Sequence, residues 1–173
     1  MRLFAAIEIS DGIKDALIEV AREFDIGRVT TVKRDAMHMT VAFLGDVDLE
    51  TAKKALWEAA HGQKRFGLRI SGIGFFTPTR IRVVYANVID GAAEIAGMNA
   101  RLMGLVGIED EKFSPHLTIA RVKPGADVRR IRGIAEKYAD MDFGGMNVTR
   151  VALIKSTLTG SGPIYEKLYE VEL

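Results

Sequence analysis

The chain has 173 residues, of which 48% are hydrophobic and 27% charged, and this composition is typical of one ordered globular unit. Cysteine is absent, which excludes disulfide bonds, cysteine nucleophiles and thiolate metal sites. The formal net charge is only +1, which argues against a protein that grips long nucleic acid through many phosphates, so we expect any bound nucleic acid to be held at one end.

The first half of the chain predicts strands and helices in alternation. The opening strand, over residues 3–9, is too short and too acidic at its end to be a signal peptide. The further expected elements are a helix over 10–24, strands over 28–32 and 38–44, a helix between 48 and 62, and a strand over 68–73. Ser10 and Asp48 are the expected N-caps. No apolar run reaches the roughly 18 residues of a membrane span, so we expect a soluble, cytoplasmic protein without membrane contact.

The second half repeats this order after a turn at Thr77-Pro78. The expected elements are a strand over 81–89, a helix over 93–106, a strand from 116, a helix over 127–138, and final strands over 148–158 and 164–173 around a glycine-rich turn at 160–163. Asp127 precedes its helix as Asp48 precedes the earlier one. We therefore predict one bilobal domain over 1–173 with an internal repeat of about 1–79 and 80–173. The expected fold class is α+β, with two antiparallel sheets, outer helices and a central cleft.

Two of the expected strands carry the same His-x-Thr-x-Ala pattern. The repeated positions are His38, Thr40 and Ala42 in one strand and His116, Thr118 and Ala120 in the other. Alternation puts each set on one face and leaves Met39, Val41 and Phe43 as an apolar stripe for the core. Duplication alone could copy a structural histidine, yet a polar face kept twice inside apolar strands is costly unless it lines a wet cleft. We therefore expect both histidines and both threonines to face one cleft.

Two imidazoles and two hydroxyls suit chemistry at phosphorus. A neutral and a protonated imidazole can act as general base and general acid near pH 7, and hydroxyls can bind the non-bridging oxygens of a phosphate. In-line displacement needs a base on one side of phosphorus and an acid on the other. Two histidines without a carboxylate at ligand spacing make a poor metal site, so we expect no metal and no cofactor. The alternative is a non-catalytic nucleotide- or RNA-binding module, which the presence of both motif histidines disfavours.

The residues around both motifs carry a family resemblance. The stretches 38–41 (His-Met-Thr-Val) and 116–119 (His-Leu-Thr-Ile) resemble the paired HxTx motifs of the 2H phosphoesterases. The wider stretches 4–7, 38–45 and 114–121 resemble the branch known as RNA 2′,3′-cyclic phosphodiesterases or 2′-5′ RNA ligases, and the likeness covers essentially the whole chain. The resemblance implies a metal-independent hydrolase that opens a 2′,3′-cyclic phosphate at an RNA 3′ end to a 2′-phosphate. It further allows an ATP-independent joining of tRNA halves.

The resemblance also assigns roles within the pair. In the family the first-motif histidine is the proton donor and the second the acceptor, which makes His38 the expected donor and His116 the expected acceptor. The nearly symmetric sequence does not by itself distinguish them. We expect Thr40 and Thr118 to bind the phosphate from either side, although β-branched residues also simply favour strands. The expected partners are RNA 3′ ends or tRNA halves that bear a cyclic phosphate, bound by a monomer.

Phe43 and Arg121 occupy equivalent positions, five residues after each motif histidine. An aromatic ring and a guanidinium plane are suited to stack on an unpaired base, and the resemblance places this pair near the terminal nucleoside. Strict alternation puts both on the face opposite the histidines, so they reach the cleft only if each strand bends or bulges near its end. We expect Arg121 to contact the substrate, because an unpaired guanidinium behind the sheet would be costly, and Phe43 to help hold the base.

Overall fold

The computed structural model describes residues 2–77, 79–108, 112–160 and 162–173. The strands are β1 (Arg2–Glu8), β2 (Val29–Thr31), β3 (His38–Gly45), β4 (Phe66–Gly74), β5 (Val83–Asp90), β6 (His116–Val122), β7 (Asp142–Val148), β8 (Arg150–Thr159) and β9 (Gly162–Glu172). The helices are α1 (Asp11–Glu23), α2 (Leu49–Ala60), α3 (Ala92–Val106) and α4 (Val128–Lys137), with a 3₁₀ turn η1 (Arg34–Ala36) before β3. The expected α+β class is confirmed.

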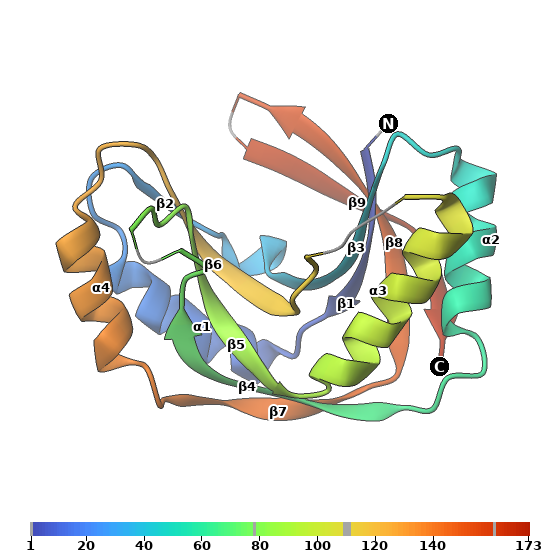
Figure 1. Cartoon of the computed structure of the whole chain (residues 1–173), viewed down its shortest axis with the longest axis horizontal. Coiled ribbons are helices and arrows are strands. Elements are labelled where there is room, and N and C mark those ends of the chain that lie inside the picture. The colour runs from blue at the N-terminus through green and yellow to red at the C-terminus, as the bar shows by residue number, and fades with distance from the viewer. Residues whose placement is uncertain (1, 78, 109–111, 161) are drawn as a thin grey trace.

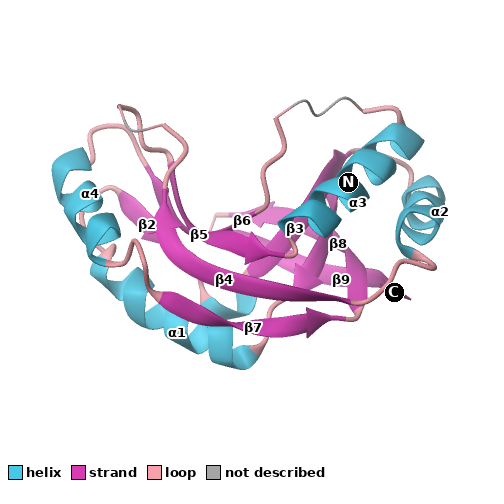
Figure 2. Ribbon diagram, turned by 60° about the horizontal axis from the view of Figure 1, so that its bottom comes forward, coloured by secondary structure: helices cyan, strands magenta, loops and turns pink. Residues whose placement is uncertain are grey.

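The described strands form two antiparallel sheets with helices packed outside them. The four-stranded sheet has the order β3-β1-β8-β9, and the five-stranded sheet has the order β2-β6-β5-β4-β7. Helices α2 and α3 pack against the first sheet, and α1 and α4 pack against the second (Figures 1 and 2). The helices bury the apolar stripes that their spacing predicts; on α1, for example, Ile13, Leu17 and Ala21 are buried. In the part of the chain that the structure describes, no helix is both long and apolar enough to cross a membrane.

Each sheet draws strands from both halves of the sequence. Strands β2 and β4 come from the first half, yet they lie in the sheet built around β5 and β6. Strands β8 and β9 come from the second half and join β1 and β3. The chain therefore passes between the two sheets after β1, β2, β3 and β7. The boundary predicted between the repeats near residue 80 is not a boundary between the sheets, and the repeat itself stays a prediction.

Two of the three expected N-caps make cap hydrogen bonds. The backbone N–H of Thr51 donates to the Asp48 carboxylate at 3.0 Å, and that of Arg130 donates to Asp127 at 3.0 Å. Ser10 stands at the N-cap of α1, but its side chain forms no cap hydrogen bond there. The short polar side chains before α2 and α4 thus fix where these helices begin.

The strand expected over 148–158 is present as β8, but β7, which precedes it, was not predicted from the sequence. Strand β7 ends at Val148 and β8 begins at Arg150, and the two lie in different sheets. Strand β7 contains Gly144 and Gly145, which are poor strand formers and hide the strand from its sequence pattern. Of the two expected turns, Pro78 in the first and Ser161 in the second lie outside the described residues.

Candidate active site

The first motif strand is interrupted by a β-bulge. Ala42 of β3 pairs with Ala5 of β1, and Thr40 pairs with Ala6, so Val41 has no partner of its own in the register. An extra residue of this kind lets two successive side chains turn to the same side of the sheet. The alternation of β3 is therefore reversed beyond Val41.

The second motif strand carries the same interruption. Thr118 of β6 pairs with Tyr85 of β5, and Ala120 pairs with Val84, so Ile119 is the extra residue. Ile119 and Ala120 are both buried, as are the two residues at the corresponding bulge of β3. The two bulges thus occupy equivalent positions in the two motifs, directly after each threonine.

The bulges decide which side chains share a face with the histidines. Ala42 and Ala120 are completely buried, so the prediction that they lie beside the histidines is wrong. Phe43 is 61% exposed, so its placement in the apolar core stripe is also wrong. Arg121 is exposed as well. One inserted residue in each strand therefore meets the condition under which Phe43 and Arg121 can reach the cleft.

At each bulge, the backbone carbonyl of the extra residue accepts a hydrogen bond from a group that does not belong to the strand paired across the bulge. The Nδ2–H group of Asn99 on α3, which is 4% exposed, donates to the carbonyl of Val41 at 2.9 Å. The carbonyl of Ile119 accepts from the backbone N–H of Val32 at 2.8 Å. A buried amide side chain stabilises the first bulge, whereas the backbone that continues β2 stabilises the second.

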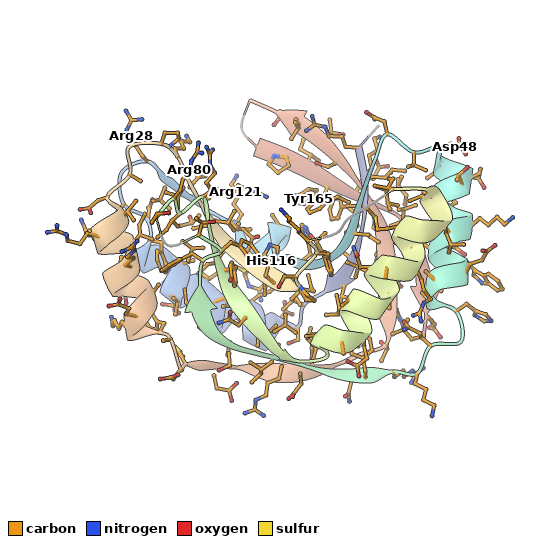
Figure 3. All side chains as sticks on the ribbon, viewed as in Figure 1. Arg28, Asp48, Arg80, His116, Arg121 and Tyr165 are labelled. Carbon is orange, nitrogen blue, oxygen red and sulfur yellow. The ribbon has the colours of Figure 1, made fainter. Side chains whose placement is uncertain are left out.

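One cleft of about 710 Å³ is lined by all six residues that the sequence nominates. They are His38, Thr40 and Phe43 on β3 and His116, Thr118 and Arg121 on β6. Strands β3 and β6 contact each other although they belong to different sheets. Figure 3 shows His116, Arg121 and Tyr165 near the middle of the molecule, between the two pairs of helices. The structure brings these side chains together, and the task of each one stays a prediction.

A hydrogen bond to the backbone orients the His116 imidazole. Its Nδ1 lies 2.7 Å from the carbonyl oxygen of Ser114, and because a carbonyl only accepts, Nδ1 carries the proton. The neutral ring therefore has its lone pair on Nε2. Burial lowers the pKa of His116 below its ordinary value, while the bond to Ser114 acts in the opposite direction.

His38 is held in a similar way but is more strongly perturbed. Burial is the main cause that lowers its pKa from 6.5 to about 4, and the nearby cations Lys14 and Arg121 lower it further. A hydrogen bond to the backbone of Ala36 raises the pKa and so opposes these effects, as expected when the ring donates to a carbonyl. Ala36 and Ser114 each lie two residues before their histidine, so the same local geometry orients both rings.

Both imidazoles are therefore neutral near pH 7 when the cleft holds no substrate. A phosphodiester bound beside them brings a negative charge, and this charge favours the protonated form of a neighbouring imidazole. One of the two rings can thus take up a proton as the substrate binds, while the other keeps its lone pair. This is the pairing of protonation states that acid-base catalysis at phosphorus requires.

Aromatic side chains flank both histidines, and the sequence patterns did not nominate them. Phe4 and Tyr165 lie 4.8 and 5.0 Å from the His38 ring, measured between ring centroids. Phe76 and Tyr85 lie 4.8 and 5.3 Å from the His116 ring. Tyr165 also lines the cleft, and it comes from β9 near the end of the chain. No spacing relative to the motifs signals its presence, because only the pairing of β8 with β9 brings it there.

Carboxylates are scarce around the two histidines. Among the described residues, no group of three or more His, Asp or Glu side chains is placed to hold a metal ion. The lining of the cleft includes Asp46, but the other charged side chains in it are cations: Arg2, Lys33 and Arg121. The electrostatic character of the cleft therefore suits an anionic ligand.

Comparisons with known proteins match nearly the whole chain. A model of the 2′-5′ RNA ligase superfamily matches residues 10–160. A protein of Methanocaldococcus jannaschii named RNA 2′,3′-cyclic phosphodiesterase is 34% identical, over 98% of this chain and 99% of its own length. A protein of Aquifex aeolicus with the same name is 32% identical, over 100% of this chain and 97% of its own length.

Solved structures share the same architecture. A crystal structure of a Thermus thermophilus protein superposes with a TM-score of 0.80 at 27% identity and covers 100% of this chain and 98% of its own. The structure of E. coli LigT complexed with 3′-AMP superposes with a TM-score of 0.76 at 25% identity and covers 99% of this chain and 96% of its own. The two-sheet arrangement around the cleft is therefore that of a known fold.

Proposed function

The chain belongs to the 2′-5′ RNA ligase superfamily, and from this we propose that its two-histidine cleft opens a 2′,3′-cyclic phosphate at an RNA 3′ end to a 2′-phosphomonoester. The observation that carries the proposal is the approach of two oriented imidazoles, one from β3 and one from β6, into a single cleft. A non-catalytic binding module has no need of such a pair.

In the proposed reaction, water attacks phosphorus from the side opposite O3′, the P–O3′ bond breaks, and a 3′ hydroxyl and a 2′-phosphate result. His116 takes the proton from water; its Nδ1–H bond to Ser114 supports this role because it leaves Nε2 as the base. His38 supplies the proton to the departing O3′. Because its pKa is about 4 in the free cleft, this step needs the charge of the bound phosphate to favour the imidazolium.

Phosphorus NMR tests this function directly. A 2′,3′-cyclic nucleotide incubated with the protein is expected to give the 2′-phosphate signal. EDTA is included to chelate free metal ions, so that turnover in its presence shows that the reaction does not need them. A 3′-phosphate product would contradict the proposed regiochemistry. Binding without any new phosphorus signal would instead favour the alternative of a non-catalytic nucleotide- or RNA-binding module.

The threonine hydroxyls are expected to donate to the phosphate oxygens. Thr40→Val and Thr118→Val keep the side-chain shape and remove the hydroxyl, so each should lower kcat/KM by roughly tenfold, on the scale of a hydrogen bond to a charged group. Steady-state kinetics on a cyclic nucleotide measures this, and thermal unfolding serves as the control. If kcat and KM do not change in either variant, the threonines only favour the strand conformation.

Arg121 is expected to stack on or contact the terminal nucleoside. Arg121→Ala should raise KM for a cyclic nucleotide by about tenfold, on the scale of base stacking, while Tm changes little because the side chain is exposed. Arg121→Lys keeps the charge and loses the plane, so a rise in KM for this variant as well would assign the effect to stacking, with Phe43 as the opposite partner. A collapse of Tm with unchanged KM would assign Arg121 to the scaffold.

We keep four further expectations as proposals. Joining of tRNA halves is allowed by the family resemblance, and the proposed hydrolysis does not depend on it. RNA 3′ ends are the proposed partners. A cytoplasmic location and a monomeric state are consistent with a chain that carries its whole cleft and lacks cysteine.

A further inference from the structure

Four cations gather at one end of the five-stranded sheet. Strands β2, β6 and β5 are antiparallel neighbours, so the start of β2, the end of β6 and the start of β5 lie side by side at one end of the strands. Just beyond these three strand ends stand Arg28, Lys123 and Arg82, and Arg80 lies two residues further out. Backbone hydrogen bonds of 2.8 Å join Lys123 to Arg28 and Val122 to Arg82. We refer to Arg28, Arg80, Arg82 and Lys123 as the basic rim.

The basic rim is continuous with the cleft through Arg121. Arg121 lines the cleft near the end of β6, and Lys123 of the rim follows it two residues later. Figure 3 shows His116, Arg121, Arg80 and Arg28 following one another from the middle of the molecule to its outer edge. Positive charge therefore leads away from the imidazole pair in one direction.

The cations of the rim are not used to pair with carboxylates. Among the described residues, the side chains of Arg80, Arg82 and Lys123 form no ion pair, and the Arg28 guanidinium donates to the carbonyl of Pro124. Other exposed arginines do pair with acids: Arg22, Arg34, Arg69 and Arg150. Arg28 also has a left-handed backbone with φ of 63°, which is unusual for a residue other than glycine. Unpaired charge on a constrained backbone is available to an external anion.

The side of the cleft that the four-stranded sheet forms carries several apolar side chains beside Arg2 and Asp46. Leu158 and Pro163, which pair across the β8–β9 hairpin, line it together with Phe43 and Tyr165. Leu158 is 61% exposed, although it is a large hydrophobic residue. A single RNA strand has phosphates on its backbone and flat, weakly polar bases beside them, and it therefore suits a cleft with apolar side chains that leads to a group of cations.

We propose that the basic rim binds the phosphates of the nucleotides that precede the cyclic-phosphate terminus, so that the preferred substrate is a single-stranded RNA end of several nucleotides and not a mononucleotide. This inference rests on the proposed function for the identity of the terminus. It assigns to the rim a separate task, which is to hold the strand upstream of the bond that breaks.

Binding and turnover of two probes test the proposal. The first probe is a fluorescein-labelled RNA tetranucleotide that ends in a 2′-phosphate. Its Kd is measured by fluorescence anisotropy while the salt concentration is varied about tenfold, from about 0.05 to about 0.5 M. The second is the same tetranucleotide with a 2′,3′-cyclic phosphate, compared with a 2′,3′-cyclic mononucleotide in steady-state kinetics. The variant is Arg28→Ala/Arg80→Ala, which removes two positive charges. The control is Arg101→Ala, which removes one charge from an exposed arginine on α3, a helix that packs against the other sheet.

Each phosphate contact on a single strand changes the slope of log Kd against log salt by about 0.7, which corresponds to roughly fivefold in Kd at about 0.1 M salt. The double variant is therefore expected to weaken tetranucleotide binding by roughly twentyfold and to lower the slope by about 1.4. Its KM should rise for the tetranucleotide and stay unchanged for the mononucleotide.

Equal effects of the double variant and Arg101→Ala, or an equal rise of KM for both substrates, would overturn the role of the rim. The anisotropy measurement does not depend on turnover. Failure of the unmodified protein to hydrolyse either substrate would therefore contradict the proposed function, while the effect of the variant on tetranucleotide binding would still decide the rim.

Discussion

Replacing His116 or His38 by alanine is expected to lower kcat/KM for a 2′,3′-cyclic nucleotide by about a hundredfold or more, on the usual scale of general acid-base catalysis. Each change removes the only imidazole on its side of the cleft, so the other ring cannot supply both proton transfers. The double variant should be little worse than either single variant, because the two rings act as one unit.

His61→Ala provides the matched control for this experiment. His61 is the third histidine of the chain, and it stacks on Trp57 at the end of α2, with ring centroids 4.4 Å apart. This variant should retain the activity of the unmodified protein. Turnover close to that of the unmodified protein in either His38→Ala or His116→Ala would rule out the paired-histidine mechanism, provided that the variants are folded.

The free energy of unfolding is expected to fall as the pH drops from 7 to 5, because His38 is neutral in the folded protein over this range. The unfolded chain binds a proton at the ordinary pKa of 6.5, whereas the folded protein binds it only near pH 4. The unfolded state therefore holds more protons between these values, and acid favours it. For His38 alone the loss is about 2 kcal/mol at pH 5 and about 3 kcal/mol once both pKa values are passed. His116 acts in the same direction.

Chemical unfolding at pH 7 and pH 5 measures this loss, and His38→Gln supplies the comparison because its amide does not titrate. Carboxylates with lowered pKa, such as Asp142 and Glu23, lose their contribution only at lower pH, since their ordinary values lie at 3.8 and 4.5. The window from pH 7 to 5 therefore isolates the histidines. An equal fall in stability for the variant and the unmodified protein would show that His38 is not held neutral by burial.

Local sequence patterns predicted the pairing of the two motifs but not the side-chain faces beyond them. Most of the helices and strands follow from spacing and caps, and the helix starts at Asp48 and Asp127 are set by side chains that lie next to them in the sequence. The bulges at Val41 and Ile119 have no such local signal. An extra residue in a strand is defined by the register with β1 or β5, so it depends on contacts that are distant along the chain.

The positions of Arg121 and Tyr165 differ in how far they could be predicted from the sequence. Alternation placed Arg121 on the core face, but the cost of burying an unpaired guanidinium argued for the cleft, and the side chain is exposed and lines the cleft. No comparable energetic argument placed Tyr165 in the cleft, because a tyrosine in an exposed strand has many acceptable positions. Its place beside His38 follows from the β8–β9 hairpin and the pairing of β8 with β1.

The four passages of the chain between the sheets bear on how the protein can move. Two lobes joined by one linker can swing about it as a hinge, and such enzymes often close on their substrate. Here the segments after β1, β2, β3 and β7 all tie the sheets together, so a hinge opening would have to deform four connections at once. We therefore expect the spacing between the two imidazoles to be set when the chain folds, so that the proposed acid-base pair needs no closing motion to form around a substrate.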